Sequence, residues 1–162
     1  MLYFEPTINP MKLLAFTLCL LMAFGFSSKS NAQNKPRVTI DHVAIYVADL
    51  RKEQSFYRDI IQLDTLAEPF HDNKHAWFTI GNGVAMHLIQ GAEQPKEYFK
   101  NHHFCFSVVS LTDFTNRLLN EKMAFEDVSG KQNSITTRID GVHQIWLKDP
   151  EGYWIEVNDA KH

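Results

Sequence analysis

The chain has 162 residues, of which 44% are hydrophobic and 22% are charged, and its formal net charge is -3 at pH 7. This length supports one domain with a hydrophobic core, and the composition is not that of a disordered protein. A slightly acidic balance provides no basic surface for nucleic acid, so we expect no nucleic-acid partner.

The first 32 residues are expected to lie outside the folded domain. Lys12 precedes an uncharged apolar run at 13–26, and small and polar residues follow up to Ala32. This order is typical of a secretory signal peptide, and the run is shorter than the about 20 residues that span a bilayer. We therefore predict an N-terminal extension and signal peptide at 1–32, a secreted or periplasmic mature protein, and no stable membrane insertion after cleavage. An uncleaved anchor is the alternative.

The first half of the remaining chain predicts one strand, one helix and three further strands. Asp49 is a suitable N-cap, and the apolar residues after it recur at helical spacing. Gly81-Asn82-Gly83 is a tight-turn signal between two strand patterns. In order, we expect a strand at 38–47, a helix at 50–61 and strands at 63–70, 75–80 and 84–90.

The same order of patterns restarts after a charged linker at 91–101. Ser110 or Thr112 can cap the second helix, and Asp149-Pro150-Glu151-Gly152 is a turn signal before the last strand. The expected elements are a strand at 103–109, the helix, a short strand at 124–128, a long strand at 137–148 and a final strand at 153–159.

These two halves are an internal repeat, which predicts two βαβββ modules in a single α+β domain at 36–160. Module one covers about 38–90 and module two about 102–159. We expect the modules to form a curled mixed sheet around a cleft, because strand twist brings one face of a sheet inward.

Each module offers two side chains that bind metals. His42 and His103 occur at the start of the first strand of each module, and His87 and Glu156 lie in the last strands. A lone strand histidine is more often structural than a ligand, but the shared register of the four residues suggests one metal site. Imidazoles with one carboxylate suit Zn, Ni, Co, Mn or Fe.

Three separated segments carry a resemblance to a known family: DHVAIYVADL at 41–50, SFY at 55–57 and DPEGYWIE at 149–156. Together they resemble the vicinal oxygen chelate superfamily, which includes glyoxalase I, bleomycin-resistance proteins and extradiol dioxygenases. The resemblance covers about 38–159. It implies that His42, His87, His103 and Glu156 are the metal ligands, and that Glu156 is also a catalytic base.

His87 departs from the pattern of bacterial glyoxalase I, which resembles His, Glu, His, Glu at these places. With a neutral imidazole there, a divalent ion and one carboxylate leave a formal charge of plus one at the site, which favours an anionic substrate. By strand alternation, His102 and His143 are expected to point away from the cleft. We expect Gln144, Trp146 and Trp154 to bind substrate in the cleft. Trp77 is expected in the core, and Cys105 is interpreted as a small packed residue and not a nucleophile.

The resemblance implies an exported, metal-dependent enzyme of the glyoxalase I-like (lactoylglutathione lyase-like) kind. It would be a lyase or isomerase acting on a small substrate with vicinal oxygens, and a homodimer. One alternative is an Fe(II) ring-cleavage oxygenase like the dioxygenases, because His42, His103 and Glu156 fit a two-histidine, one-carboxylate triad. A second is a metal-free binding protein that resembles bleomycin-resistance proteins.

Overall fold

The computed structural model describes Tyr3, residues 38–94 and residues 96–161. Apart from Tyr3, the predicted extension and signal peptide lie outside these described residues. Thr39–His162 is one compact unit, and it contains all the helices and strands given below. None of the helices in the described part of the chain is long and apolar enough to cross a membrane.

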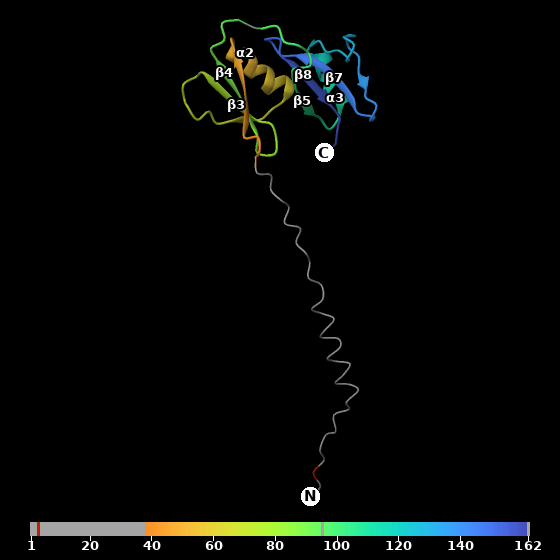
Figure 1. Cartoon of the computed structure of the whole chain (residues 1–162), viewed down its shortest axis with the longest axis horizontal. Coiled ribbons are helices and arrows are strands. Elements are labelled where there is room, and N and C mark those ends of the chain that lie inside the picture. Colours follow the sequence, from red (N-terminus) through yellow and green to blue (C-terminus); the bar gives the residue numbers. More distant parts are fainter. Residues whose placement is uncertain (1–2, 4–37, 95, 162) are drawn as a thin grey trace. The chain divides into compact units, whose positions relative to one another are not determined.

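Module one contains a four-stranded mixed sheet in the order β1-β4-β3-β2 (Figure 1). Strand β1 runs parallel to β4, and the two remaining pairs are antiparallel. Its elements are β1 (His42–Val47), α2 (Leu50–Ser55), the π-helix η1 (Phe56–Ile61), β2 (Thr65–Leu66), β3 (His75–Thr79) and β4 (Ala85–Gln90).

Module two repeats this topology in the order β5-β8-β7-β6, with β5 parallel to β8. Its elements are β5 (His103–Ser107), α3 (Leu111–Asn120), β6 (Thr136–Thr137), β7 (His143–Lys148) and β8 (Trp154–Asn158). The predicted α+β fold of two βαβββ modules is therefore confirmed.

The strand predicted at 38–47 begins at His42 in the structure, and three other predicted strands differ more strongly. The long strand at 137–148 is two strands, β6 and β7, because the chain turns between Arg138 and Val142, whose backbone groups are hydrogen-bonded. Gly141 in this turn has a φ of 85°, which glycine adopts without strain. The strand at 124–128 is reduced to isolated bridges from Glu126, and the strand at 63–70 is only the two residues of β2.

The helices are capped as the sequence indicates. Asp49 accepts a hydrogen bond from the backbone N–H of Lys52 at the start of α2, and Ser110 accepts one from Asp113 at the start of α3. The π-helix is capped at its C-terminus by Gln62, which has a left-handed backbone, and Arg117 of α3 donates to the carbonyl of Ile60 at 3.0 Å. An α3 side chain therefore satisfies an end of the helix in module one.

The turn before β8 ties the two modules together. Glu151 Oε1 accepts hydrogen bonds from the backbone N–H groups of Ala48 and Asp49 at 2.5 and 2.7 Å. The hydroxyl of Tyr57 donates to Asp149 Oδ2 at 3.0 Å, and both side chains are buried. The sequence motif at 149–152 thus fixes module two against the start of α2.

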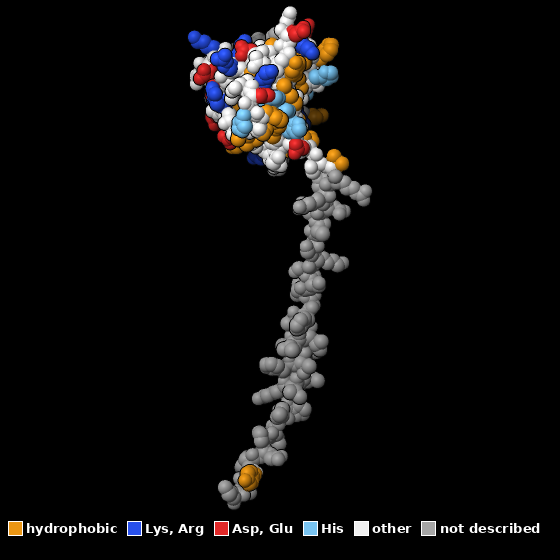
Figure 2. Space-filling model, turned by 90° about the vertical axis from the view of Figure 1, so that its left-hand side faces the viewer, with side chains coloured by type: hydrophobic (Ala, Val, Ile, Leu, Met, Phe, Trp, Pro, Cys, Tyr) orange, Lys and Arg blue, Asp and Glu red, His pale blue; other side chains and the backbone are white. Residues whose placement is uncertain are grey.

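Each sheet has one face in the core and a second face that carries the predicted ligand residues. Along β1, Ile45 and Val47 are buried while His42, Ala44 and Tyr46 are exposed. His42, Ala44 and Tyr46 alternate with the buried residues and therefore lie on the opposite face of the sheet, which we call open face A. The ladder places His87 and Trp77 on this face, because His87 pairs with Ala44 and Trp77 pairs with His87. Figure 2 shows histidine side chains beside hydrophobic ones on one face of the domain.

The second sheet has an equivalent surface, open face B. His103 and Cys105 of β5 lie in register with Trp154 and Glu156 of β8, so these four side chains share a face. Trp146 of β7 is paired with Glu156 and belongs to the same face. Both halves of the predicted ligand set therefore lie on corresponding faces of the two sheets.

Candidate metal centre

His42 and His87 form a pair on open face A. Their ring centroids are 5.0 Å apart, and the ring planes are perpendicular. Two imidazoles bound to one ion at Zn–N distances of about 2.1 Å and a tetrahedral angle have centroids about 5 Å apart. Asp41 accepts a hydrogen bond from His42 Nδ1 at 2.8 Å, which leaves Nε2 of this ring free to bind a metal.

His87 is buried against Trp77, with ring centroids 4.1 Å apart. Its Nδ1 atom is buried without a hydrogen-bond partner in the described structure. Burial lowers the pKa of His87, and the neighbouring His42 and His75 lower it further. These effects favour the neutral imidazole, which is the form that binds metals.

His103 and Glu156 form the second pair, on open face B. His103 Nε2 lies 3.5 Å from Glu156 Oε2. Two ligand atoms about 2.1 Å from one ion, at the tetrahedral angle, are about 3.4 Å apart. His103 Nδ1 donates to the carbonyl oxygen of Lys100 at 3.1 Å, so a neutral ring would point its Nε2 lone pair at the carboxylate. A cation between the two atoms, either a proton or a metal ion, removes this repulsion.

The other oxygen of Glu156 is held by neighbouring side chains. Oε1 accepts from Asn158 Nδ2 at 3.1 Å and from the Cys105 thiol at 3.3 Å. Partners of this kind orient a ligating carboxylate and leave the second oxygen for the metal. Oε2 is therefore the oxygen of Glu156 that these hydrogen bonds leave available.

The four predicted ligands therefore occur as two pairs. The facing atoms of His103 and Glu156 have the spacing of two ligands on one divalent ion, and the ring-centroid distance of His42 and His87 is compatible with such an arrangement. Among the described residues, the group of three whose ligand atoms lie within 4.8 Å of one another is a different one, as described next. The convergence of all four side chains on a single ion stays a prediction.

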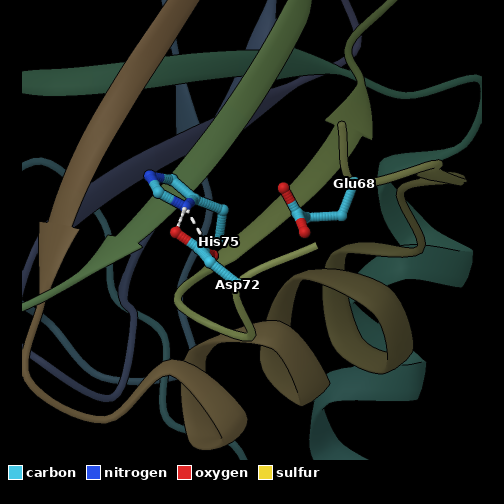
Figure 3. Close-up of side chains that lie close together, drawn as sticks. All are labelled: Glu68, Asp72 and His75. Atoms are coloured by element: carbon cyan, nitrogen blue, oxygen red, sulfur yellow. Dashed lines mark hydrogen bonds and ion pairs between the residues drawn. The ribbon is translucent and has the colours of Figure 1, made fainter. Parts of the chain in front are cut away.

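A possible ligand triad is formed by Glu68, Asp72 and His75 (Figure 3). His75 Nδ1 lies 3.0 and 3.1 Å from the two carboxylate oxygens of Asp72. Asp72 also accepts from the backbone N–H of Lys74, and the pKa of Asp72 is lowered mainly by its hydrogen bond to His75. The His75–Asp72 ion pair thus satisfies most of this group without a metal.

The predicted substrate-binding residues lie on open face B. Trp146 packs edge-on against His103, with ring centroids 4.4 Å apart. Trp154 is in register with His103, and Gln144, which is buried, is paired with Asn158. Their contact with a substrate stays a prediction.

Sequence reasoning placed Trp77 in the core, but the structure places it on open face A beside His87. Trp77 corresponds to Trp146 in the repeat, because each is paired with the last-strand ligand of its module. His75 was missed: its ring lies parallel to that of His87 at 6.0 Å. Positions 75, 77 and 79 alternate with the positions between them along β3, so the sequence places His75 and Trp77 on the same face of this strand.

Cys105 is exposed and not packed as predicted. Partial burial of its thiol, with the hydrogen bond to Glu156 and the negative charge of that carboxylate, raises the Cys105 pKa to about 12. The thiol is therefore a poor nucleophile at neutral pH. His143 is bound by Asp159, with Nδ1 and Oδ2 2.9 Å apart.

The fold defines a class of proteins built from two βαβββ modules, and here each sheet carries a pair of side chains of metal-binding type. Residues 39–157 match the model of the glyoxalase/bleomycin resistance protein/dioxygenase superfamily, so the chain belongs to this family. The chain is also similar to YwbC of Bacillus subtilis (strain 168), an uncharacterized protein, with 28% identity over 126 residues, 72% of this chain and 94% of that protein.

Solved structures that share this fold belong to proteins with different described activities. Oxidase ChaP-H2 has a TM-score of 0.65 and 18% identity, over 78% of this chain and 97% of that one. The fosfomycin resistance protein FosX of Listeria monocytogenes has a TM-score of 0.60 and 18% identity, over 76% and 94% of the two chains. Lactoylglutathione lyase of Agrobacterium tumefaciens has a TM-score of 0.57 and 19% identity, over 76% and 94%.

Proposed function

We propose that this protein is a metal-dependent enzyme of the glyoxalase I-like kind, a lyase or isomerase for a small substrate with vicinal oxygens. The observation that carries the proposal is the His103–Glu156 pair, whose facing atoms lie 3.5 Å apart with both outer atoms held by other groups. The proposal includes export, on the basis of the signal-peptide pattern at 1–32.

His42, His87, His103 and Glu156 would hold a divalent ion. Such an ion, when bound, polarises a carbonyl or enediolate oxygen as a Lewis acid. Three imidazoles and one carboxylate leave the site one positive charge, which favours a substrate with paired, partly anionic oxygens.

Glu156 is the residue that we assign to proton transfer. Its Oε2 lies 3.5 Å from His103 Nε2, while Asn158 and Cys105 hold Oε1. A carboxylate fixed in this way can take a proton from one carbon of the substrate and return it to the adjacent carbon. Position 87 is a histidine and not a glutamate, so Glu156 is the single carboxylate among the four predicted ligands.

The proposal includes a homodimer in which a second copy completes the site. Tyr46 is 55% exposed and Leu66 is 44% exposed, and the sheet register places both on open face A with His42. Exposed apolar side chains around polar residues such as His42 are typical of a surface that contacts another protein. Open face A of one copy against open face B of the other would bring the two ligand pairs together.

An iron-dependent oxygenase is the second candidate, because His87 is covered by Trp77 and His42, His103 and Glu156 alone fit the two-histidine, one-carboxylate triad. An oxidase is among the proteins with this fold. Activity that requires Fe(II) and oxygen would favour this candidate over the lyase.

The test is metal analysis of the purified protein and of His103→Ala, followed by a screen of dicarbonyl, thiol-adduct and catechol substrates. We expect stoichiometric divalent metal and turnover in the wild type, and loss of both in His103→Ala. His143→Ala is the matched control, because His143 is also held by a hydrogen bond but lies on the other face of its sheet. Ligand binding by a protein that folds without metal would instead indicate a metal-free binding function.

A further inference from the structure

The imidazole ring of His103 is oriented by the residue three positions before it. His103 Nδ1 lies 3.1 Å from the carbonyl oxygen of Lys100, and Trp146 packs edge-on against the ring with centroids 4.4 Å apart. A carbonyl oxygen only accepts hydrogen bonds, so Nδ1 carries the proton and Nε2 of the neutral ring presents its lone pair. The position of this one carbonyl therefore sets which nitrogen of His103 faces Glu156.

The carbonyl of Lys100 lies outside the strands of the sheet. Lys100 and Asn101 form a turn, in which the backbone N–H of His102 donates to the carbonyl of Phe99 at 2.8 Å. Strand β5 begins only at His103. Because no strand ladder holds Lys100, the position of its carbonyl depends on the turn and on the side-chain contacts of this segment.

The ammonium group of Lys100 is surrounded by acceptors. Its Nζ donates to Glu126 Oε1 at 2.7 Å and to the backbone carbonyls of Asp127 and Val128 at 2.8 and 3.5 Å. An ammonium group has three N–H donors, so each donor has an acceptor here. The Lys100 and Glu126 side chains are only 22% and 19% exposed, which strengthens this charge-assisted hydrogen bond. The side chain is therefore fixed, whereas most lysine side chains extend into solvent.

The same ammonium group lies against two indole rings. It is 5.4 Å from the ring centre of Trp146 and 5.1 Å from that of Trp154, distances at which a cation is attracted to an aromatic face. The indole N–H of Trp154 also donates to the carbonyl of Tyr98 at 3.0 Å, two residues before Lys100. These contacts anchor the segment to β7 and β8. Trp146 contacts both the ammonium group of Lys100 and the ring of His103.

The corresponding histidine of module one is oriented by a different kind of group. His42 Nδ1 is hydrogen-bonded to the neighbouring Asp41, whose side chain is 92% exposed. His103 has a neutral backbone acceptor instead, and this acceptor belongs to a residue with an anchored side chain. In module two, the orientation of the ring is thus linked to an ion pair on other elements of the module.

We propose that Lys100 is the positioning residue of His103: its ammonium group, anchored at Glu126 and the two indole rings, fixes the carbonyl that directs His103 Nε2 toward the metal. As a statement about a predicted metal ligand, this inference rests on the proposed function. The hydrogen bond between His103 and Lys100 does not require a metal, so the orientation of the ring can be measured separately from metal binding.

The first experiment is long-range proton–nitrogen NMR of the imidazole rings in the chelator-treated full chain at about pH 9, where histidine side chains are ordinarily neutral. We expect one predominant tautomer of His103, with the proton on Nδ1; the signals are assigned by their loss in His103→Ala. Lys100→Met keeps an unbranched side chain without the ammonium group and should give a mixture of both tautomers. Lys100→Arg, which restores the charge and the donors, should recover the wild-type tautomer.

The second experiment is titration of the same proteins with Zn²⁺ against a competing chelator. Lys100→Met should bind zinc roughly 10–100-fold more weakly, the usual effect of losing a group that orients a ligand, and Lys100→Arg should retain most of the affinity. Glu126→Gln removes the counter-charge and should also weaken zinc binding, which keeps the comparison possible if Lys100→Met does not fold. Both substitutions break one contact, so the double variant should be no weaker than Lys100→Met alone.

Lys148→Met is the matched control, because the Lys148 ammonium group also lies over Trp154, at 4.6 Å, but among the described residues it is Lys100 whose carbonyl accepts from His103. This variant should keep the wild-type tautomer and zinc affinity. A wild-type His103 with its proton on Nε2, or a Lys100→Met protein with the wild-type tautomer, would overturn the inference. Equal losses of zinc affinity in Lys100→Met and Lys148→Met would also contradict it. A chain that binds no stoichiometric zinc, but whose His103 tautomer changes in Lys100→Met, would count against the proposed function and support the positioning role.

Discussion

At the scale of single residues, the best-defined group of the candidate site is the Glu156 carboxylate. Its two oxygens have different surroundings: Oε1 is bound by Asn158 and Cys105, and Oε2 faces His103. Asn158 in turn accepts a hydrogen bond from the Ser107 hydroxyl at 3.1 Å. The orientation of the ligand therefore depends on a short chain of polar contacts.

Asn158→Ala should weaken metal binding by roughly 10–100-fold, the usual effect of losing a group that orients a ligand. The carboxylate of Glu156 remains, but its rotamer is no longer fixed from the Oε1 side. Titration with Zn²⁺ against a competing chelator measures the change. Asp159→Asn, which alters the neighbouring residue but contacts His143 instead, should bind as the wild type. Equal affinities for the two variants would mean that Asn158 does not orient the ligand.

Glu53 is a second residue whose chemistry depends on its surroundings. It is fully buried, and burial, followed by the negative charges of Asp149 and Glu151, raises its pKa to about 9. Among the described residues neither carboxyl oxygen of Glu53 has a hydrogen-bond partner, and burial is the largest cause of the raised pKa. At neutral pH the folded protein keeps this group protonated.

The free energy of unfolding should therefore fall as pH rises from about 4.5 to about 9, because the folded state holds a proton that the unfolded chain releases. Glu53→Gln, which resembles the protonated acid, should match the wild type near pH 4.5 and exceed its stability by at least about 1 kcal/mol at pH 8.5. Urea unfolding at the two pH values measures this. Glu121→Gln, an exposed control, should show no such gain, and an unstable Glu53→Gln at pH 8.5 would contradict the raised pKa.

At the scale of elements, the start of α2 and the turn before β8 act as one unit. Glu151 satisfies the backbone N–H groups of Ala48 and Asp49, which precede α2, and Asp149 accepts from the backbone N–H groups of Glu151 and Tyr153 within the turn. The two hydrogen bonds to Glu151 link segments more than 100 residues apart in the chain. They position β8, and therefore Glu156, relative to module one.

Glu151→Ala should lower the free energy of unfolding by about 1–3 kcal/mol, because two partly buried N–H groups lose their acceptor. Urea unfolding of the chain measures the loss. Asp59→Ala is the control, since its ion pair with Arg58 is on the surface and should contribute less than about 1 kcal/mol. Similar losses for the two variants would show that the turn is not a structural link.

The element level also shows what the sequence could predict. The start of each module was readable because His42 and His103 open two similar strand patterns, and the caps Asp49 and Ser110 follow directly. The sequence does not show which face of β3 is buried. Strand alternation places His75 and Trp77 on one face but does not indicate which face a helix covers. The Asp140-Gly141 turn was present in the sequence, but β-branched and apolar residues on both sides concealed it.

At the scale of the whole molecule, the repeat gives two sheets with equivalent open faces. Each face carries a histidine from the first strand of its module, a predicted ligand from the last strand, and a tryptophan in register with that predicted ligand. The pairing of residues within each face could be predicted from strand alternation. How the faces meet could not, because that depends on contacts between modules or copies and leaves no periodic signal in one chain.

A mixture of two variant proteins tests whether two chains share a site. One preparation carries His42→Ala and His87→Ala, which remove the predicted ligands of open face A. The other carries Glu156→Gln, which removes the predicted carboxylate ligand of open face B. In a mixture, each heterodimer should regain one complete metal site, and about a quarter of the wild-type metal per chain should return at equal proportions, by random pairing. A site within one chain predicts no recovery, and the same count on the unmixed preparations is the control.

The most direct measurement is a crystal structure of the metal-loaded protein with anomalous diffraction at the absorption edge of the metal. The proposal predicts one strong peak per site, about 2.0–2.2 Å from ligand atoms of His42, His87, His103 and Glu156. A peak at Glu68, Asp72 and His75 alone, or coordination by one ligand pair without the other, would contradict it.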